Sequence, residues 1–159
     1  GGSFRVRVHE RNGWSPMVHT VADGVYNGAY FLELTAAGND VHAAWLESGE
    51  RRTRRLDAAR SIWSPVVPFD GHVSAQFCTA GDPLGGVLHA WTTLDTVQAQ
   101  IYSPSSQSWG TVETLYAGGD IIGNASLTCV VDPWRRATVA WTLRDPANNR
   151  YSVFSRTYR

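Results

Sequence analysis

One turn near the C-terminal end of the chain carries the side chains with the clearest capacity to bind a ligand. It reads Asp132-Pro133-Trp134-Arg135-Arg136. An indole in a polar turn can stack on a sugar ring or a base, and a neighbouring guanidinium can hold a carboxylate or sulfate. We therefore take Trp134 and Arg135 as candidate ligand-binding residues. The alternative is that the indole folds back over the edge of its sheet or packs against a partner chain.

Three polar loops carry further candidates. They combine acidic, amide, phenol and imidazole side chains: Asp23, Tyr26, Asn27, Asp70, His72, Asp120 and Asn124. The composition differs from loop to loop, as a ligand site requires. The members that we expect to contact a ligand are Tyr26, His72, Asp120 and Asn124. Asp and Asn are also the residues that tight turns need, so a purely structural role stays open.

The sequence contains no motif that pairs a nucleophile with a base. All 14 basic residues are arginine, which excludes lysine Schiff-base chemistry. His42 and His89 occupy the same strand of successive repeats but opposite faces of it, so they do not form a metal-binding pair. We therefore expect no enzymatic activity, no cofactor and no metal site.

An arginine-rich run, Arg51-Arg52-Thr53-Arg54-Arg55, could clamp a sulfated glycan or a nucleic-acid backbone. On a strand, however, Arg51 and Arg55 face one way while Arg52 and Arg54 face the other. The formal net charge of the chain is zero, so no overall field attracts nucleic acid or an anionic membrane. We interpret the run as solvated sheet surface and expect neither nucleic acid nor membrane as a partner.

The elements that would position these residues are indicated by an internal repeat of roughly 48 residues. Two series of tryptophans share this period: Trp14, Trp63 and Trp109 form the first, and Trp45, Trp91 and Trp141 form the second. A residue that recurs once per repeat is most simply the wedge that packs adjacent sheets. We therefore expect all six indoles in the core, with stacking on sugars as the alternative.

Within each period, β-branched and aromatic stretches bounded by turn residues predict four strands. In the second repeat these are residues 74–79, 86–92, 96–102 and 109–115. At the N-terminus, 4–9 and 14–18 read as the third and fourth strands of a preceding unit. At the C-terminus, 151–158 ends a unit that lacks its fourth strand. Four antiparallel strands per repeat of this length are typical of a β-propeller blade.

The phrase from residue 102 to 110 reads YSPSSQSWG and is followed by a turn, a strand, an Asp-Pro turn and an Ala-Trp strand. It resembles the Asp-box repeats of bacterial sialidase-like β-propellers, and the resemblance covers about 4–159. The Asp-box consensus, a serine, an aspartate and a glycine before the tryptophan, is degenerate in all three copies. The resemblance therefore implies a shared fold rather than a shared activity. The residue types of a sialidase site occur singly: Arg144, Tyr26, Glu47 and Asp95.

We thus predict an all-β chain, a β-propeller of about three four-stranded antiparallel blades. Residues 1–3 read as a linker or cloning scar, and 4–159 as the repeat region, with repeats at about 14–62, 63–108 and 109–159 and with 4–13 in the preceding blade. Because propellers have about four to eight blades, three cannot close a ring. We expect a homodimer to complete a six-bladed ring; the alternative is an excised part of a longer protein.

Cys78 and Cys129 have the spacing of neither a zinc site nor a CxxC motif, and we expect them to be small buried apolar side chains. The N-terminus has no signal-peptide pattern, so the compartment is not readable there, although a secreted or extracellular location is favoured. The function that fits best is a non-enzymatic, lectin-like module that binds carbohydrate. The alternatives are a protein-interaction scaffold or fragment of a larger secreted propeller and, third, a sialidase-like glycoside hydrolase fragment.

Overall fold

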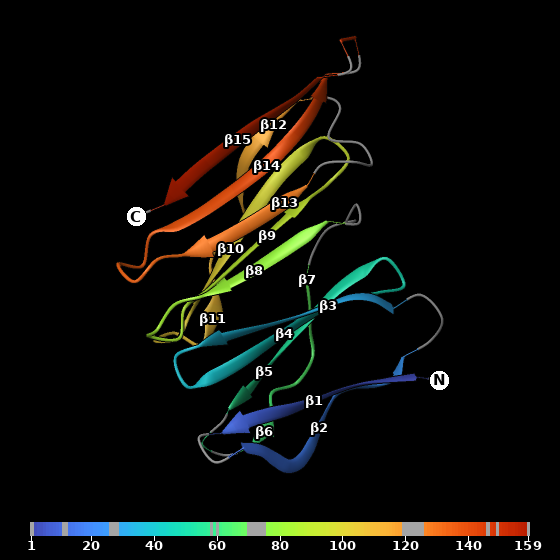
Figure 1. The fold of residues 1–159 in the computed structure, drawn as a ribbon, viewed down its shortest axis with the longest axis vertical. Coiled ribbons are helices and arrows are strands. Elements are labelled where there is room, and N and C mark those ends of the chain that lie inside the picture. Colours follow the sequence, from blue (N-terminus) through green and yellow to red (C-terminus); the bar gives the residue numbers. More distant parts are fainter. Residues whose placement is uncertain are drawn as a thin grey trace.

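The computed structural model describes most of the chain. The described residues are 2–10, 13–25, 29–57, 59, 61–69, 76–118, 126–145, 147, 148 and 150–158. Within these ranges the regular structure is entirely β-strand and forms four antiparallel sheets. Figure 1 shows the sheets stacked in chain order, from the N-terminal pair of strands to the C-terminal three. None of the described residues belongs to a helix long and apolar enough to cross a membrane.

The N-terminal hairpin consists of β1 (Gly2–Glu10) and β2 (Gly13–Val25), which pair antiparallel. Val21 and Ala22 of β2 are buried, and they belong to the cluster that joins the hairpin to the next sheet. The two strands predicted between residues 4 and 18 are therefore confirmed, and both are longer than expected.

Three larger sheets follow the hairpin, and we number them first to third. In the first sheet the strands lie in the order in which they occur in the chain. They are β3 (Ala29–Ala37), β4 (Asp40–Glu47), β5 (Glu50–Asp57), β6 (Ile62–Trp63) and β7 (Val67–Phe69). Strands β6 and β7 both pair with β5, so together they take the fourth position of the sheet.

The second sheet repeats this arrangement. Its strands are β8 (Phe77–Gly81), β9 (Val87–Thr92), β10 (Thr96–Ser103), β11 (Ser108–Trp109) and β12 (Glu113–Ala117), with β11 and β12 both on β10. All four predicted strands of this repeat are confirmed, although the first begins at Phe77, three residues later than predicted, and the fourth is split.

The third sheet consists of β13 (Leu127–Val131), β14 (Ala137–Asp145) and β15 (Arg150–Tyr158). Within the described chain β15 pairs only with β14, so it forms the edge of this sheet. The prediction that this unit ends without a fourth strand holds for the described residues.

The outer strands of the first and second sheets open at the same point, directly after the tryptophan. There each strand keeps one more backbone hydrogen bond, from Ser64 N–H to Arg55 O or from Gly110 N–H to Ile101 O, and then leaves its ladder. Pairing resumes at Val67 in the first sheet and at Glu113 in the second. A side chain of the neighbouring strand binds the released carbonyl: Arg54 Nε donates to Ser64 O at 3.1 Å, and Gln100 Nε2 donates to Gly110 O at 2.6 Å. Because a backbone carbonyl that leaves its ladder needs another partner, the opening is a specified feature of the repeat.

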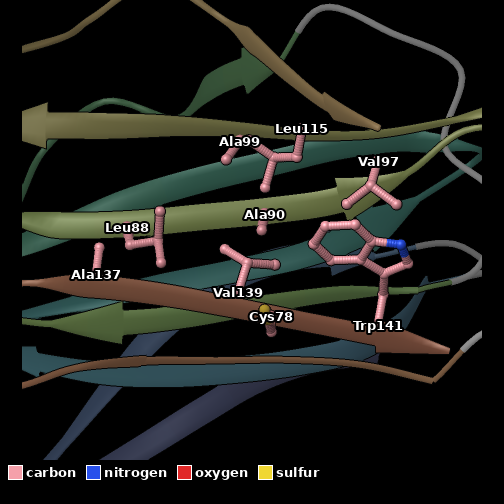
Figure 2. Packing of buried hydrophobic residues seen from close by; sticks show 9 residues of the cluster. All are labelled: Cys78, Leu88, Ala90, Val97, Ala99, Leu115, Ala137, Val139 and Trp141. Atoms are coloured by element: carbon pink, nitrogen blue, oxygen red, sulfur yellow. The ribbon is translucent and has the colours of Figure 1, made fainter. Parts of the chain in front are cut away.

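The second tryptophan series forms the core between sheets, as predicted. Trp45, Trp91 and Trp141 are at most 4% exposed, and each belongs to a cluster with residues of the preceding sheet. The largest cluster joins the second and third sheets and is drawn in Figure 2: Cys78, Leu88, Ala90, Val97, Ala99, Leu115, Ala137, Val139 and Trp141.

The first tryptophan series differs from the expectation. Trp63 and Trp109 are partly buried, whereas Trp14 is 65% exposed. Trp63 packs in the cluster of the N-terminal hairpin and Trp109 packs with Ala37 of the first sheet, so each uses the sheet before its own. Trp14 lies in the hairpin, and no described sheet precedes that hairpin. Its assignment to the core is therefore wrong.

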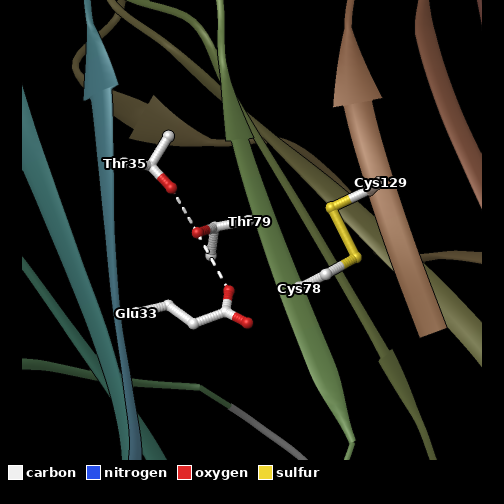
Figure 3. The surroundings of a disulfide bond; sticks show 5 residues. All are labelled: Glu33, Thr35, Cys78, Thr79 and Cys129. Carbon is white, nitrogen blue, oxygen red and sulfur yellow. Dashed lines mark hydrogen bonds between the residues drawn. A yellow bond between two sulfur atoms is a disulfide. The ribbon is translucent and has the colours of Figure 1, made fainter. Parts of the chain in front are cut away.

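The first strands of the three larger sheets, β3, β8 and β13, are linked to one another through β8. One side of β8 is bound to β13 and the other side to β3 (Figure 3). Cys78 forms a disulfide with Cys129 of β13, with the two Cα atoms 5.9 Å apart. Thr79, the next residue, faces β3 instead: it donates to Glu33 Oε2 at 3.1 Å and is hydrogen bonded to Thr35. The two cysteines were expected to be small buried apolar side chains; Cys78 is buried and Cys129 is partly buried. The disulfide itself was not anticipated, because only the stacking of the sheets brings together two cysteines that are 51 residues apart in sequence.

Candidate functional site

Of the six residues expected to bind a ligand, Trp134 and Arg135 lie in the described part of the chain. The other four, Tyr26, His72, Asp120 and Asn124, fall outside the described residues, so their placement stays a prediction.

Trp134 lies at the tip of the turn between β13 and β14. Asp132 Oδ1 accepts hydrogen bonds from the backbone N–H groups of Trp134 (2.9 Å) and Arg136 (2.8 Å), which fixes the turn. The indole is 77% exposed, and the Arg136 guanidinium carbon lies 5.3 Å from its ring centre. Trp134 therefore does not fold back over its sheet, and most of its side chain is accessible to solvent.

Arg135 joins this turn to the equivalent turn of the second sheet. Its Nε donates to Oδ2 of the buried Asp82 at 3.1 Å. Burial by itself would raise the pKa of Asp82, but the N–H groups of Gly86 and Leu84 and the Arg135 guanidinium lower this pKa below its ordinary value. The arginine expected to bind a ligand thus also holds two sheets together.

A cleft of about 400 Å³ lies between the second and third sheets beside this turn, and we call it the turn cleft. Asp82, Trp134 and Arg135 contribute its polar and aromatic residues, while Ile101 and Val131 line it with apolar surface. An apolar cleft with a few converging polar groups is the usual form of a small-ligand site.

A second kind of cleft, which we call the outer cleft, occurs where an outer strand opens. The first outer cleft, of about 230 Å³, lies between the first and second sheets. Its polar and aromatic residues include His42 and Arg55 of the first sheet and Tyr102 and Trp109 of the second. This cleft was not identified in the sequence analysis. An alignment of the repeats could have pointed to it, because His42 and Arg55 stand where the next repeat has Leu88 and Ile101.

The arginine run is placed differently from the expectation. Arg51 is 0% exposed, and its guanidinium carbon lies 3.8 Å from the centre of the Trp91 ring in the second sheet. Burial lowers the pKa of Arg51 to about 9. The predicted division is confirmed, since Arg51 and Arg55 face the second sheet while Arg54 binds Val21 O of the hairpin at 2.6 Å. The run is packed between sheets, so its assignment to solvated surface is wrong.

The two histidines lie on opposite faces of their own sheets, as predicted, yet both line the same interface. His42 and His89 each approach Trp109, with ring centres 6.5 and 6.0 Å apart. The reason is that the rear face of one sheet packs on the front face of the next. Within the described residues, no group of three or more His, Cys, Asp and Glu side chains could hold a metal ion.

Of the four residues considered for hydrolysis, Glu47 and Asp95 are bound within their own hairpins. Glu47 Oε2 forms an ion pair with Arg52 Nε at 3.1 Å, and Asp95 Oδ1 accepts a hydrogen bond from the Thr93 hydroxyl at 3.2 Å. Arg144 is exposed near the end of β14, and Tyr26 lies outside the described residues.

No protein-family model and no curated protein matches the sequence. Solved structures share the fold. AofleA from Arthrobotrys oligospora matches with a TM-score of 0.57 and 12% identity, over 100% of this chain and 50% of that one. The intramolecular trans-sialidase from Ruminococcus gnavus matches with a TM-score of 0.56 and 9% identity, over 94% and 36% of the two chains.

A variant of the NanB sialidase from Streptococcus pneumoniae matches with a TM-score of 0.55 and 11% identity, over 94% of this chain and 27% of that one. The chain therefore spans half or less of the length of these structures. At such identities the likeness shows the fold alone: this all-β chain of stacked antiparallel sheets has a sialidase-like fold.

Proposed function

We propose that the protein is a non-enzymatic module that binds carbohydrate between the sheets of a propeller-type array. The observation that carries the proposal is the exposed Trp134 beside the turn cleft, with its backbone fixed by Asp132. An indole that is 77% exposed has no packing role in its own sheet. It is suited to stack on the apolar face of a sugar, a contact on the scale of one to a few kcal/mol.

The disulfide between the second and third sheets supports a secreted location, because disulfides persist in oxidising compartments. Strand β15 is exposed along almost its entire length, and an exposed edge invites association. On that basis a homodimer that closes a six-bladed ring remains part of the proposal. A solution mass of twice 17.5 kDa would support it, and a stable monomer would contradict it.

The second candidate is a protein-interaction scaffold or a part of a larger propeller. The observation that favours it is the exposed apolar surface of β15, where Val153 is 75% exposed. A sialidase-like hydrolase is the third reading, supported by the fold likeness alone.

A glycan array on the parent protein tests the proposal, followed by affinity measurements on Trp134→Ala. We expect the variant to melt like the parent and to bind its glycan about 5- to 100-fold more weakly, the loss of one stacking contact. Leu84→Ala is the matched control, because Leu84 occupies the same position of the equivalent turn and is also exposed. No binder on a broad array would favour the scaffold, and turnover of a fluorogenic sialoside would favour the hydrolase.

A further inference from the structure

The outer cleft occurs twice in the described chain, and its lining residues correspond position by position. In the first outer cleft the first sheet contributes His42, Thr53, Arg54, Arg55, Ser64, Pro65 and Val67. In the second outer cleft the second sheet contributes Leu88, Ala99, Gln100, Ile101, Gly110, Thr111 and Glu113. The following sheet closes each cleft with a tyrosine near the end of its third strand, Tyr102 in one case and Tyr158 in the other.

The strand registers establish this correspondence. His42 pairs with Arg55 as Leu88 pairs with Ile101, and Thr53 pairs with Val67 as Ala99 pairs with Glu113. The opening of the outer strand creates both clefts in the same way. The cleft is thus a product of the repeat, and its chemistry is set by the side chains that each repeat supplies.

The charged side chains that line the two outer clefts have opposite sign. Arg54 and Arg55 both line the first, and none of its lining residues is acidic. The guanidinium of Arg55 faces the second sheet, whereas that of Arg54 is bound to Val21 O and Ser64 O. At the same positions the second outer cleft has Gln100 and Ile101, and it adds the carboxylate of Glu113. A cationic cleft with an aromatic wall complements an anionic ring, whereas its acidic counterpart repels one.

Arg55 is held ready at the boundary of the two sheets. Its Nη1 donates to the hydroxyl of Tyr102 at 3.0 Å and lies 3.5 Å from Asp40 Oδ2. These contacts leave other guanidinium N–H groups, since arginine has five donors in a planar fork. The side chain therefore needs little reordering to bind a carboxylate, which reduces the entropic cost of binding.

His42 supplies a second feature that points to a ligand. It is 5% exposed, it lines the first outer cleft, and its Nε2 has no hydrogen-bond partner. A buried polar atom without a partner is costly, and a hydroxyl group in the cleft would offset that cost.

The geometry points to the first outer cleft as a second binding site, specific for an acidic sugar residue. In this site Arg55 holds the anionic group, Trp109 lies along the apolar face of the ring, and His42 forms a hydrogen bond with a hydroxyl group. The inference rests on the proposed carbohydrate binding but concerns a cleft that does not contain Trp134.

The test compares methyl β-glucuronide with methyl β-glucoside, which differ only in the carboxylate. In NMR titrations, the ¹⁵N-labelled parent should bind the glucuronide at least about tenfold more tightly than the glucoside. The glucuronide should also shift the NMR signal of the indole N–H of Trp109. Glucose 6-sulfate, as a third probe, shows whether the site takes any anionic sugar or a carboxylate alone. Equal affinity for glucuronide and glucoside, or shifts confined to Trp134, would overturn the inference.

Two variants copy the second outer cleft into the first: Arg55→Ile and His42→Leu introduce the residues that the repeat already accepts there. Arg55→Ile should abolish the preference for the glucuronide, whereas Trp134→Ala should leave it intact. If neutral glycans bind through Trp134 while the glucuronide is not preferred, this inference fails and the proposed function stands. If neither sugar nor any array glycan binds, both fail. The parent titration is decisive even if Arg55→Ile does not fold.

Discussion

Asp82 and Arg135 form an ion pair, Oδ2 to Nε at 3.1 Å, between equivalent turns of the second and third sheets. The backbone carbonyl of Asp82 also accepts a hydrogen bond from the N–H of Gly38, in the corresponding turn of the first sheet, at 2.9 Å. One aspartate thus links three consecutive turns along one edge of the array. Its counterpart Asp132 forms its side-chain contacts within its own turn.

Replacement of Asp82 should therefore affect stability more than replacement of Asp132. Asp82→Ala leaves the partly buried N–H of Leu84 and the buried N–H of Gly86 without their acceptor, and it removes the partner of Arg135. We expect the free energy of unfolding to fall by about 1–3 kcal/mol, measured by urea denaturation. Asp132→Ala, in an exposed turn, is the control and should be less harmful. Equal effects would contradict a link between the sheets.

The periodicity of the sequence predicted the strands well but not their packing. The strands around Trp91 follow from β-branched stretches and turn residues, which are local signals. The disulfide between Cys78 and Cys129 and the burial of Arg51 depend on which faces of successive sheets meet, and a single sequence does not record that contact. The split outer strand was also missed, because Ser64 and Gly110 read as an ordinary strand continuation.

The candidate site shows the same limit. Trp134 could be singled out because it stands outside the repeat, and the structure shows that it is mostly exposed, while its contact with a ligand stays a prediction. The first outer cleft was missed because Arg55 and Trp109 are far apart in sequence and each looked like a structural residue. His42 and His89 were correctly assigned to opposite faces of equivalent strands in successive sheets. The stacking of the sheets nevertheless brings both side chains to the interface between the first and second sheets.

Burial separates the effects expected at two repeating tryptophans. Trp91 is 0% exposed between the first and second sheets, and Trp91→Ala should lower the free energy of unfolding by about 3–5 kcal/mol. Trp14 is mostly exposed, and Trp14→Ala should change it by no more than about 0.5 kcal/mol. Chemical denaturation of both variants gives the comparison. A large loss at Trp14 together with a small one at Trp91 would reverse the assignment of the core.

The disulfide should stabilise the contact between the second and third sheets. It closes a loop of 51 residues, for which the chain-entropy estimate is about 4 kcal/mol. Denaturation with and without reductant, with the thiols counted after unfolding, measures this contribution. The double variant Cys78→Ala, Cys129→Ala should match the reduced parent. Two reactive thiols in the unreduced, unfolded protein would show that the bond is absent.

The buried histidine of the first outer cleft makes stability depend on pH. Burial, followed by the charge of Arg55, lowers the pKa of His42 to about 4, and Asp40 only partly opposes this. The unfolded chain has the ordinary histidine pKa of about 6.5, so between pH 6.5 and 4 it binds a proton that the folded protein excludes. The contribution is therefore complete above pH 6.5 and is lost as the pH falls toward 4.

Denaturation at pH 7 and at pH 4.5 measures this loss, at a pH where most surface carboxylates are still ionised. We expect His42 to account for about 2–3 kcal/mol of the difference between the two conditions. His89, fully buried and with its pKa also lowered by burial, adds to the fall in the parent. The variant His42→Leu, which copies Leu88 of the second sheet, should lose less stability than the parent between pH 7 and pH 4.5, and the difference should equal the contribution of His42. If parent and variant fall by the same amount, His42 is protonated in the folded protein and the cleft is more hydrated than its geometry indicates.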